Sequence, residues 1–114
     1  TCPLTAETTN LVDADVLASM KQTAYVINVA RGQCVDEPEL AKALKSGSIA
    51  GAGIDHFWDE PLGADSDFWE MENVIVTPHT GGETRLYEER LIDILDDNLG
   101  RLWSGETTLR NHIA

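Results

Sequence analysis

The chain has 114 residues, 42% hydrophobic and 25% charged, a composition typical of a soluble globular domain and unlike disordered, collagen-like or coiled-coil chains. Its 8 basic and 20 acidic side chains give a formal net charge of −12, which argues against a nucleic acid partner. No apolar run approaches the roughly 18 residues of a membrane helix, so we expect no membrane partner. Two cysteines without a CxxC spacing, Cys2 and Cys34, favour reduced thiols and a cytoplasmic location.

The first half of the chain alternates predicted helices and strands. An aspartate can cap a helix over 13–20, and the apolar run at 23–29 is typical of a strand in a sheet with both faces covered. Asp36 and Glu39 form a capping-box pattern, which predicts a second helix that ends at Gly47. This half therefore predicts helix, strand and helix in that order.

The second half predicts two more strands and one long helix. The segment 49–55 is typical of a buried strand, 56–72 of an irregular loop, and 73–77 of a third strand. A glycine pair at 81–82 indicates a turn before an amphipathic helix over 83–104, whose outer face is acidic. The order predicts an α/β fold, part of a doubly wound parallel sheet.

Titratable and charged side chains lie just beyond the predicted strands, where ligands bind in such sheets. Arg31 offers a planar fork of donors that fits a carboxylate with two hydrogen bonds. His79 can move a proton near neutral pH, and Glu60, if adjacent, would orient its ring and stabilise its protonated form. Asp55 could accept hydrogen bonds from a ligand amide, and Gly81 could offer a backbone N–H.

Each of these features also has a purely structural interpretation. Arg31 could form a surface ion pair, and His79 could cap the long helix. His56 and His112 are expected to be structural or solvent-facing. We expect no metal site, because the histidines and carboxylates over 55–79 lack a recognised ligand spacing.

The three tryptophans and the second cysteine are expected to be packing residues. Trp58, Trp69 and Trp103 lie among apolar neighbours in the sequence, which favours packing over ligand binding. Cys34 has no neighbouring base, which favours a buried, inert thiol over a nucleophile.

Four ordered segments resemble those of the D-isomer-specific 2-hydroxyacid dehydrogenases, which use NAD or NADP to interconvert 2-oxo acids and D-2-hydroxy acids. They are CPLTAET at 2–8, NVARGQCVD at 28–36, AGAGIDHFWDEPL at 50–62 and TPHTGGET at 77–84. Their order and spacing together are a more specific signal than any one segment, and they extend over most of the chain.

The resemblance implies an enzyme that reduces a small 2-oxo acid to the D-2-hydroxy acid, or the reverse, with NAD or NADP. By this resemblance Arg31 would bind the substrate carboxylate, His79 would be the acid–base catalyst, and Glu60 would pair with its imidazole. The coenzyme would contact Pro3, Thr8, Ala30, Arg31, Asp55, His79 and Gly81.

The chain also departs from the family pattern. His56 stands where the family usually has an apolar residue, and the dinucleotide-binding pattern GxGxxG begins at Gly51 without being completed. The resemblance therefore implies that residues 1–114 are a C-terminal portion of an NAD(P)-binding domain. Residues from about 86 to 114 would form a long helix and tail that lead toward a substrate domain outside the chain. The isolated chain would be inactive, and the complete protein would be a homodimer.

A function of another class stays open. Because the phosphate-binding turn is absent from the chain, these residues could instead form a free-standing, non-catalytic binding or oligomerisation module derived from the same fold. A native gene product of this length would favour the module, and a longer product would favour the enzyme.

Overall fold

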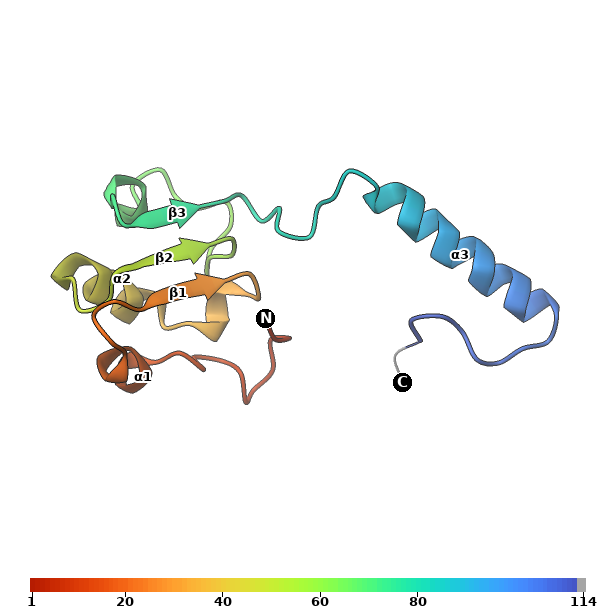
Figure 1. The fold of residues 1–114 in the computed structure, drawn as a ribbon, viewed down its shortest axis with the longest axis horizontal. Helices are drawn as coiled ribbons and strands as arrows, with labels where there is room; N and C mark the ends of the chain where they lie inside the picture. The colour runs from red at the N-terminus through yellow and green to blue at the C-terminus, as the bar shows by residue number, and fades with distance from the viewer. Residues whose placement is uncertain (113–114) are drawn as a thin grey trace. The chain divides into compact units, whose positions relative to one another are not determined.

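A computed structural model describes residues 1–112 and divides the chain into two compact units between Gly81 and Gly82. The first unit holds a parallel sheet with helices, and the second holds one long helix and a tail (Figure 1). The elements of the first unit are the helices and strands α1 (Ala14–Ser19), β1 (Tyr25–Asn28), α2 (Glu37–Ser46), β2 (Gly51–Ile54) and β3 (Val74–Val76), and the short 3-10 helices η1 (Gly32–Cys34) and η2 (Asp67–Glu70). The predicted order of helices and strands in this unit is confirmed.

The three strands form a parallel sheet in the order β1-β2-β3. Tyr25 pairs with Gly51, and Ala52 pairs with Val74, so neighbouring strands run side by side along their whole length. Each strand is shorter at both ends than the sequence predicts. Because the strands are parallel, their carboxyl ends meet at one edge of the sheet.

Capping residues set the ends of α1 and α2 as predicted. Asp13 accepts a hydrogen bond from Val16 N at 2.9 Å, and Asp36 accepts one from Glu39 N at 3.1 Å. Gly47 ends α2 with a φ of 69°, a left-handed conformation that glycine adopts without strain. These caps satisfy backbone groups that a helix end would otherwise leave unpaired.

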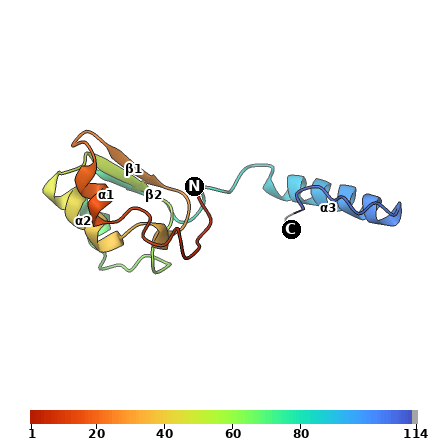
Figure 2. The ribbon, with the colours of Figure 1, turned by 90° about the horizontal axis from the view of Figure 1, so that it is seen from below.

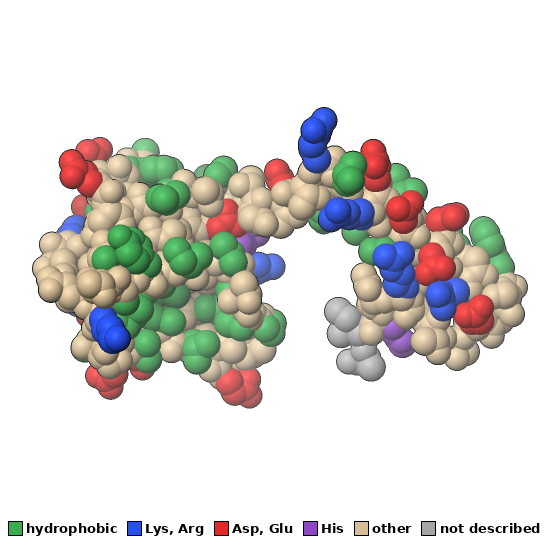
Figure 3. Space-filling model, viewed as in Figure 1, with side chains coloured by type: hydrophobic (Ala, Val, Ile, Leu, Met, Phe, Trp, Pro, Cys, Tyr) green, Lys and Arg blue, Asp and Glu red, His purple; other side chains and the backbone are tan. Residues whose placement is uncertain are grey.

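Both helices of the first unit lie on the same face of the sheet (Figure 2). Val26 is buried on that face, whereas its strand neighbours Tyr25 and Ile27 are 66% and 65% exposed. Figure 3 shows hydrophobic side chains gathered over the strands. The prediction of a sheet covered on both faces is therefore wrong for residues 1–81, because strand side chains alternate between the faces and the helices of this unit cover one of them.

The core lies between the sheet and the two helices. Leu40 of α2 and Ile49, just before β2, are its most deeply buried large side chains. Phe57 and Phe68 close the core from the following loop, with ring centroids 5.6 Å apart. The loop predicted at 56–72 is thus anchored by two buried aromatic rings and includes η2.

The tryptophans are at the surface. Trp58, Trp69 and Trp103 are 37%, 51% and 82% exposed, so the prediction that they are packing anchors is wrong. Trp58 Nε1 donates to Val35 O at 2.9 Å, and Trp69 Nε1 donates to Gly63 O at 2.8 Å. Hydrogen bonds from the indole nitrogens therefore hold these two side chains in place.

The N-terminal segment is tied to the turn after β1. Cys34 is buried as predicted, burial raises the pKa of its thiol, and its Sγ lies 3.7 Å from that of Cys2. Asn10 N donates to Gln33 O at 2.8 Å in the same region. The positions of the two cysteines in the sequence did not predict that their sulfur atoms lie close together.

The second unit contains α3 (Tyr87–Trp103). The helix begins at Tyr87 rather than at 83, because Tyr87 N donates to Thr84 O in a preceding turn. It ends at Trp103 with Ser104 as its C-cap, close to the predicted end at about 104. None of its residues is buried, and acidic side chains lie along it (Figure 3). No helix within residues 1–112 is long and apolar enough to cross a membrane.

Candidate functional site

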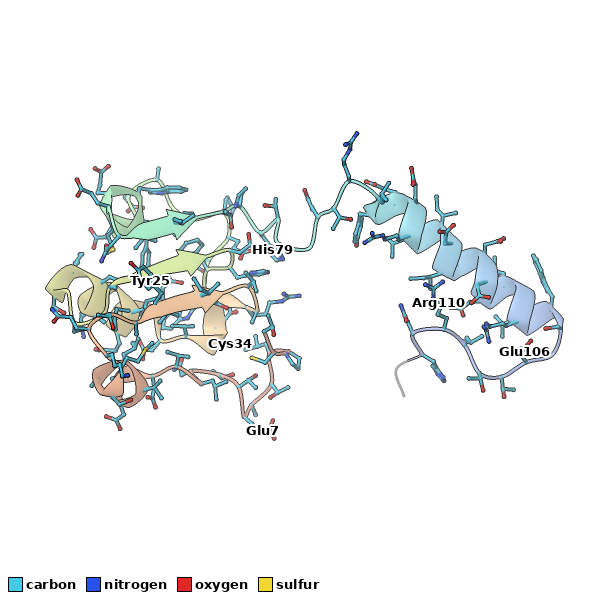
Figure 4. All side chains as sticks on the ribbon, in the orientation of Figure 1. Glu7, Tyr25, Cys34, His79, Glu106 and Arg110 are labelled. Atoms are coloured by element: carbon cyan, nitrogen blue, oxygen red, sulfur yellow. The ribbon has the colours of Figure 1, made fainter. Side chains whose placement is uncertain are left out.

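The carboxyl edge of the sheet brings together side chains from three separate segments. Arg31 lies just beyond β1, and Asp55 and His56 follow β2. His79 lies just beyond β3 (Figure 4). Glu60 reaches the same place from the loop after β2. Hydrogen bonds and close contacts join these five residues, which we call the strand-end cluster.

The turn that carries Arg31 is fixed by the buried side chain of Asn28. Asn28 Nδ2 donates to Arg31 O at 3.0 Å, and Asn28 Oδ1 accepts from Ala30 N at 3.0 Å. A Cβ atom at Gly32 would lie 2.0 Å from the carbonyl carbon of Phe57. The turn therefore requires glycine at this position, because the backbone at residue 57 passes directly against it.

Asp55 is only 3% exposed, and the segment after β3 surrounds its carboxylate with donors. Oδ1 accepts hydrogen bonds from the Thr77 hydroxyl and from Thr80 N at 2.9 Å, and Oδ2 accepts one from Gly81 N at 2.9 Å. These bonds, that of Thr77 above all, hold the pKa of Asp55 below its ordinary value despite burial. A Cβ atom at Gly81 would lie 2.8 Å from Oδ2, so glycine permits this approach.

His79 and Glu60 form a partly exposed pair. His79 Nδ1 is 2.7 Å from Glu60 Oε2, and the two side chains are 48% and 36% exposed. This hydrogen bond lowers the pKa of Glu60, whose Oε1 also accepts from Phe57 N at 3.0 Å. With Nδ1 engaged, His79 Nε2 is the nitrogen available to exchange a proton with a ligand.

The backbone of His79 is unusual. Its φ of 57° lies in the left-handed region, which is strained for a residue with a side chain and is common at functional sites. The interpretation of His79 as a helix cap is wrong, because the N-cap of α3 is Leu86.

Arg31 is exposed, and its guanidinium contacts the strand-end cluster through Nη1. Nη1 donates to Ala30 O at 2.6 Å and lies 3.3 Å from His56 Nε2. Within residues 1–112 Arg31 forms no ion pair with a carboxylate, so the surface ion pair is not observed. Its guanidinium therefore keeps donors for an external carboxylate.

His56 is a residue of the site that the sequence did not reveal. It is not solvent-facing, since it is 5% exposed, and its ring centroid lies 3.8 Å from that of His79. Its Nδ1 is 3.4 Å from Asp55 Oδ2 but makes no hydrogen bond to any residue that the structure describes. Burial, assisted by the nearby His79, lowers the pKa of His56.

Pro3 and Thr8 belong to a separate turn in the N-terminal segment. Thr8 Oγ1 donates to Pro3 O at 2.7 Å and accepts from Thr5 N at 2.8 Å. Among the described residues, no hydrogen bond joins Pro3 or Thr8 to the strand-end cluster. Their contact with a coenzyme stays a prediction.

A cavity of about 620 Å³ lies beside the His79–Glu60 pair. Its wall is mainly apolar and includes Phe57, Leu62 and Trp69, while His79 and Glu60 supply polar groups at its rim. Arg31 does not line it, so the cavity adjoins the His79–Glu60 pair and not the guanidinium.

Residues 1–81 match the family described as "D-isomer specific 2-hydroxyacid dehydrogenase, NAD binding domain". The chain belongs to this family. Of its curated relatives, glyoxylate/hydroxypyruvate reductase B of Pectobacterium carotovorum is 43% identical over 106 residues, which cover 93% of this chain and 33% of the relative. The chain thus spans about a third of the length of the curated relatives it matches.

Solved structures give the same result. A 2-hydroxyacid dehydrogenase from Xanthobacter autotrophicus, in complex with NADPH and MES, matches with a TM-score of 0.86 and 40% identity, over all of this chain and 46% of the other. An NADPH-dependent glyoxylate/hydroxypyruvate reductase from Sinorhizobium meliloti, in complex with NADP and sulfate, matches with a TM-score of 0.87 and 31% identity, over 98% of this chain and 36% of the other.

The matches confirm the family and the α/β, Rossmann-like fold, and at the level of the family they confirm a nicotinamide dinucleotide cofactor. The individual roles of the site residues stay predictions. Residues 1–112 contain no group of three His, Cys, Asp or Glu side chains arranged to hold a metal ion, and the expected absence of a metal also stays a prediction.

Proposed function

We propose that this chain is the C-terminal portion of the NAD(P)-binding domain of an oxidoreductase that interconverts small 2-oxo acids and D-2-hydroxy acids. The observation that supports it most is the strand-end cluster, in which a free guanidinium and a histidine–carboxylate pair lie at one edge of the sheet. Glyoxylate and hydroxypyruvate, which appear in the names of its relatives, are the first substrates to test.

Arg31 would bind the substrate carboxylate. Its guanidinium is always charged and its fork geometry matches a carboxylate with two hydrogen bonds. Because Nη1 is already held by Ala30 O, the remaining donors have a defined direction before substrate arrives. This preorganisation lowers the ordering cost of binding.

His79 would move the proton. In the direction of reduction, protonated His79 shares Nδ1–H with Glu60 and donates the proton on Nε2 to the carbonyl oxygen of the 2-oxo acid. In the direction of oxidation the neutral Nε2 takes the hydroxyl proton. Glu60 holds the ring in one orientation through both directions.

The site residues fit the nicotinamide end of a coenzyme. Asp55, whose Oδ2 accepts a backbone amide, would meet the carboxamide of the nicotinamide, and Ala30 and Gly81 bring backbone close to the same edge. A bound nicotinamide supplies the hydride that the carbonyl carbon receives. The residues of this chain provide the alignment and the proton.

The decisive experiment is an assay of the complete gene product. We expect oxidation of NADH or NADPH in the presence of glyoxylate or hydroxypyruvate, followed by nicotinamide absorbance. His79→Ala should lower kcat/KM by about 100- to 10,000-fold, because it removes the general acid. His112→Ala, at an exposed histidine of the tail, is the matched control and should leave turnover unchanged. Unaltered turnover in the His79 variant would refute the assignment.

The same proposal covers the organisation of the protein. Residues 86–114 would lead toward the substrate domain, and the complete protein would be a homodimer. The two free thiols, Cys2 and Cys34, support a cytoplasmic location.

The alternative, a free-standing non-catalytic module, is tested by the mass of the native product. A product well above 12.5 kDa supports the enzyme, and one of 12.5 kDa supports the module.

A further inference from the structure

His56 carries a buried polar atom that the proposed chemistry leaves unexplained. Its imidazole is nearly inaccessible to water, and Nδ1 has no hydrogen-bond partner among residues 1–112. An unpaired buried polar group costs about 1–3 kcal/mol, so an apolar side chain would suit the position better if packing were its only role. The ring instead lies between Arg31 and His79, the two residues proposed to hold and protonate the substrate.

The contact with Arg31 determines the tautomer of His56. A guanidinium nitrogen can only donate, so His56 Nε2, 3.3 Å from Arg31 Nη1, must be the unprotonated acceptor. The ring proton of neutral His56 then resides on Nδ1, which faces Asp55 Oδ2 at 3.4 Å. The carboxylate favours this tautomer by its charge, although the geometry falls short of a hydrogen bond.

We propose that His56 is a positioning residue: in its neutral Nδ1–H tautomer it accepts a hydrogen bond from Arg31 and fixes the guanidinium for the substrate carboxylate, while its ring supports that of His79. The inference rests on the proposed function, since it concerns the same site. Two acceptors, Ala30 O and His56 Nε2, then define the position of Nη1, and the remaining guanidinium donors are left for the ligand.

The groups around His56 oppose its protonation on balance. Asp55 and Glu60 favour a charged ring, whereas burial, His79 and Arg31 favour the neutral form, and the net effect lowers its pKa. A protonated ring would present Nε2–H to a guanidinium N–H, so the contact with Arg31 would be lost. The affinity for a 2-oxo acid should therefore fall in acid.

Two substitutions in the complete enzyme separate positioning from packing. His56→Leu removes the acceptor but keeps an apolar side chain, whereas His56→Gln keeps an acceptor oxygen close to the position of Nε2. We expect the KM for the 2-oxo acid to rise about 10- to 100-fold in the leucine variant, as for loss of a hydrogen bond to a charged group, with a smaller change in kcat. The glutamine variant should return KM to within a few-fold of the parent value.

A pH series adds a readout that packing alone would not change. In the parent enzyme KM should rise as the pH falls through the pKa of His56, which burial holds below the ordinary value of 6.5, and the glutamine variant should lack this rise. The glutamine side chain keeps an acceptor at this position but does not titrate, so the difference between the two proteins reports on residue 56. An unchanged KM in the leucine variant, or a glutamine variant no better than leucine, would overturn the proposal. A parent enzyme inactive on every 2-oxo acid would instead refute the proposed function.

Nitrogen NMR of the histidine rings tests the tautomer in the parent protein, independently of activity. With ¹⁵N-labelled histidine, and with His56→Gln to identify the signals that this ring contributes, His56 should show a protonated Nδ1 and an unprotonated Nε2 near neutral pH. The opposite tautomer, or a charged ring, would contradict the contact with Arg31.

Discussion

Asp55 keeps a carboxylate almost entirely out of water, and donors from the segment after β3 make this possible. Because its pKa is lower in the folded protein than in the unfolded chain, folding is favoured by the charged form. This stability is fully present above the ordinary value of 3.8 and is lost as the pH falls through the lower value of the folded state.

We therefore expect urea unfolding of the complete protein to show a free energy that declines in acid below pH 3.8. Asp55→Asn should lower the free energy of unfolding near neutral pH by about 1–3 kcal/mol, because an amide cannot accept all of these hydrogen bonds, and it should flatten the acid decline. An equally steep decline in the variant would show that other carboxylates carry the effect.

Four residues of the strand-end cluster could be predicted from their positions in the sequence. Arg31, Asp55, Glu60 and His79 follow apolar runs that read as parallel strands, and such strands end at one edge. His56 follows the same run as Asp55, but its burial beside that carboxylate could not be predicted. In a continuing strand, neighbouring side chains point to opposite faces, so His56 would point away from Asp55. The chain leaves β2 at this point, however, and both side chains are buried in the cluster.

At the scale of elements, the close contact between the turn after β1 and the loop after β2 determines the position of Arg31. The backbone at Gly32 touches that of Phe57 closely enough to exclude any side chain. Gly32→Ala should lower the free energy of unfolding by about 1–3 kcal/mol, the range for an overpacked site, and should raise the KM for the 2-oxo acid.

Gly82→Ala is the matched control for this substitution, because a Cβ atom there meets nothing within 4 Å. Both variants are compared by urea unfolding of the complete protein. Equal stabilities for the two alanine variants would contradict the close contact between the turn and the loop.

The helices α1 and α2 could be predicted from their caps, because an aspartate side chain caps the start of each helix and Gly47 ends α2. The start of α3 carries no such side chain, so its periodic pattern predicted a helix that began too early. The sequence also did not predict that one face of the sheet is exposed in these residues. An apolar run shows that side chains are hydrophobic, but it does not show which neighbours cover them.

For the whole molecule, the chain holds the residues proposed to transfer a proton and to bind the substrate carboxylate, but it does not complete the glycine-rich GxGxxG pattern of a phosphate-binding turn. We expect the isolated 114-residue chain to bind NADH only weakly, with a Kd well above micromolar, and to lack turnover. Fluorescence titration with NADH measures this, and the complete gene product is its control. Submicromolar binding by the isolated chain would show that phosphate contacts outside it are dispensable.

The left-handed backbone of His79 sets a limit on how far this protein can be stabilised. Glycine at position 79 would relieve the strained conformation, which costs of the order of 1–3 kcal/mol, and would make the loop easier to fold. It would also delete the imidazole. Selection for thermal stability alone would favour that exchange, whereas the proposed proton transfer requires the imidazole, so a protein engineer must seek stabilising changes elsewhere in the fold.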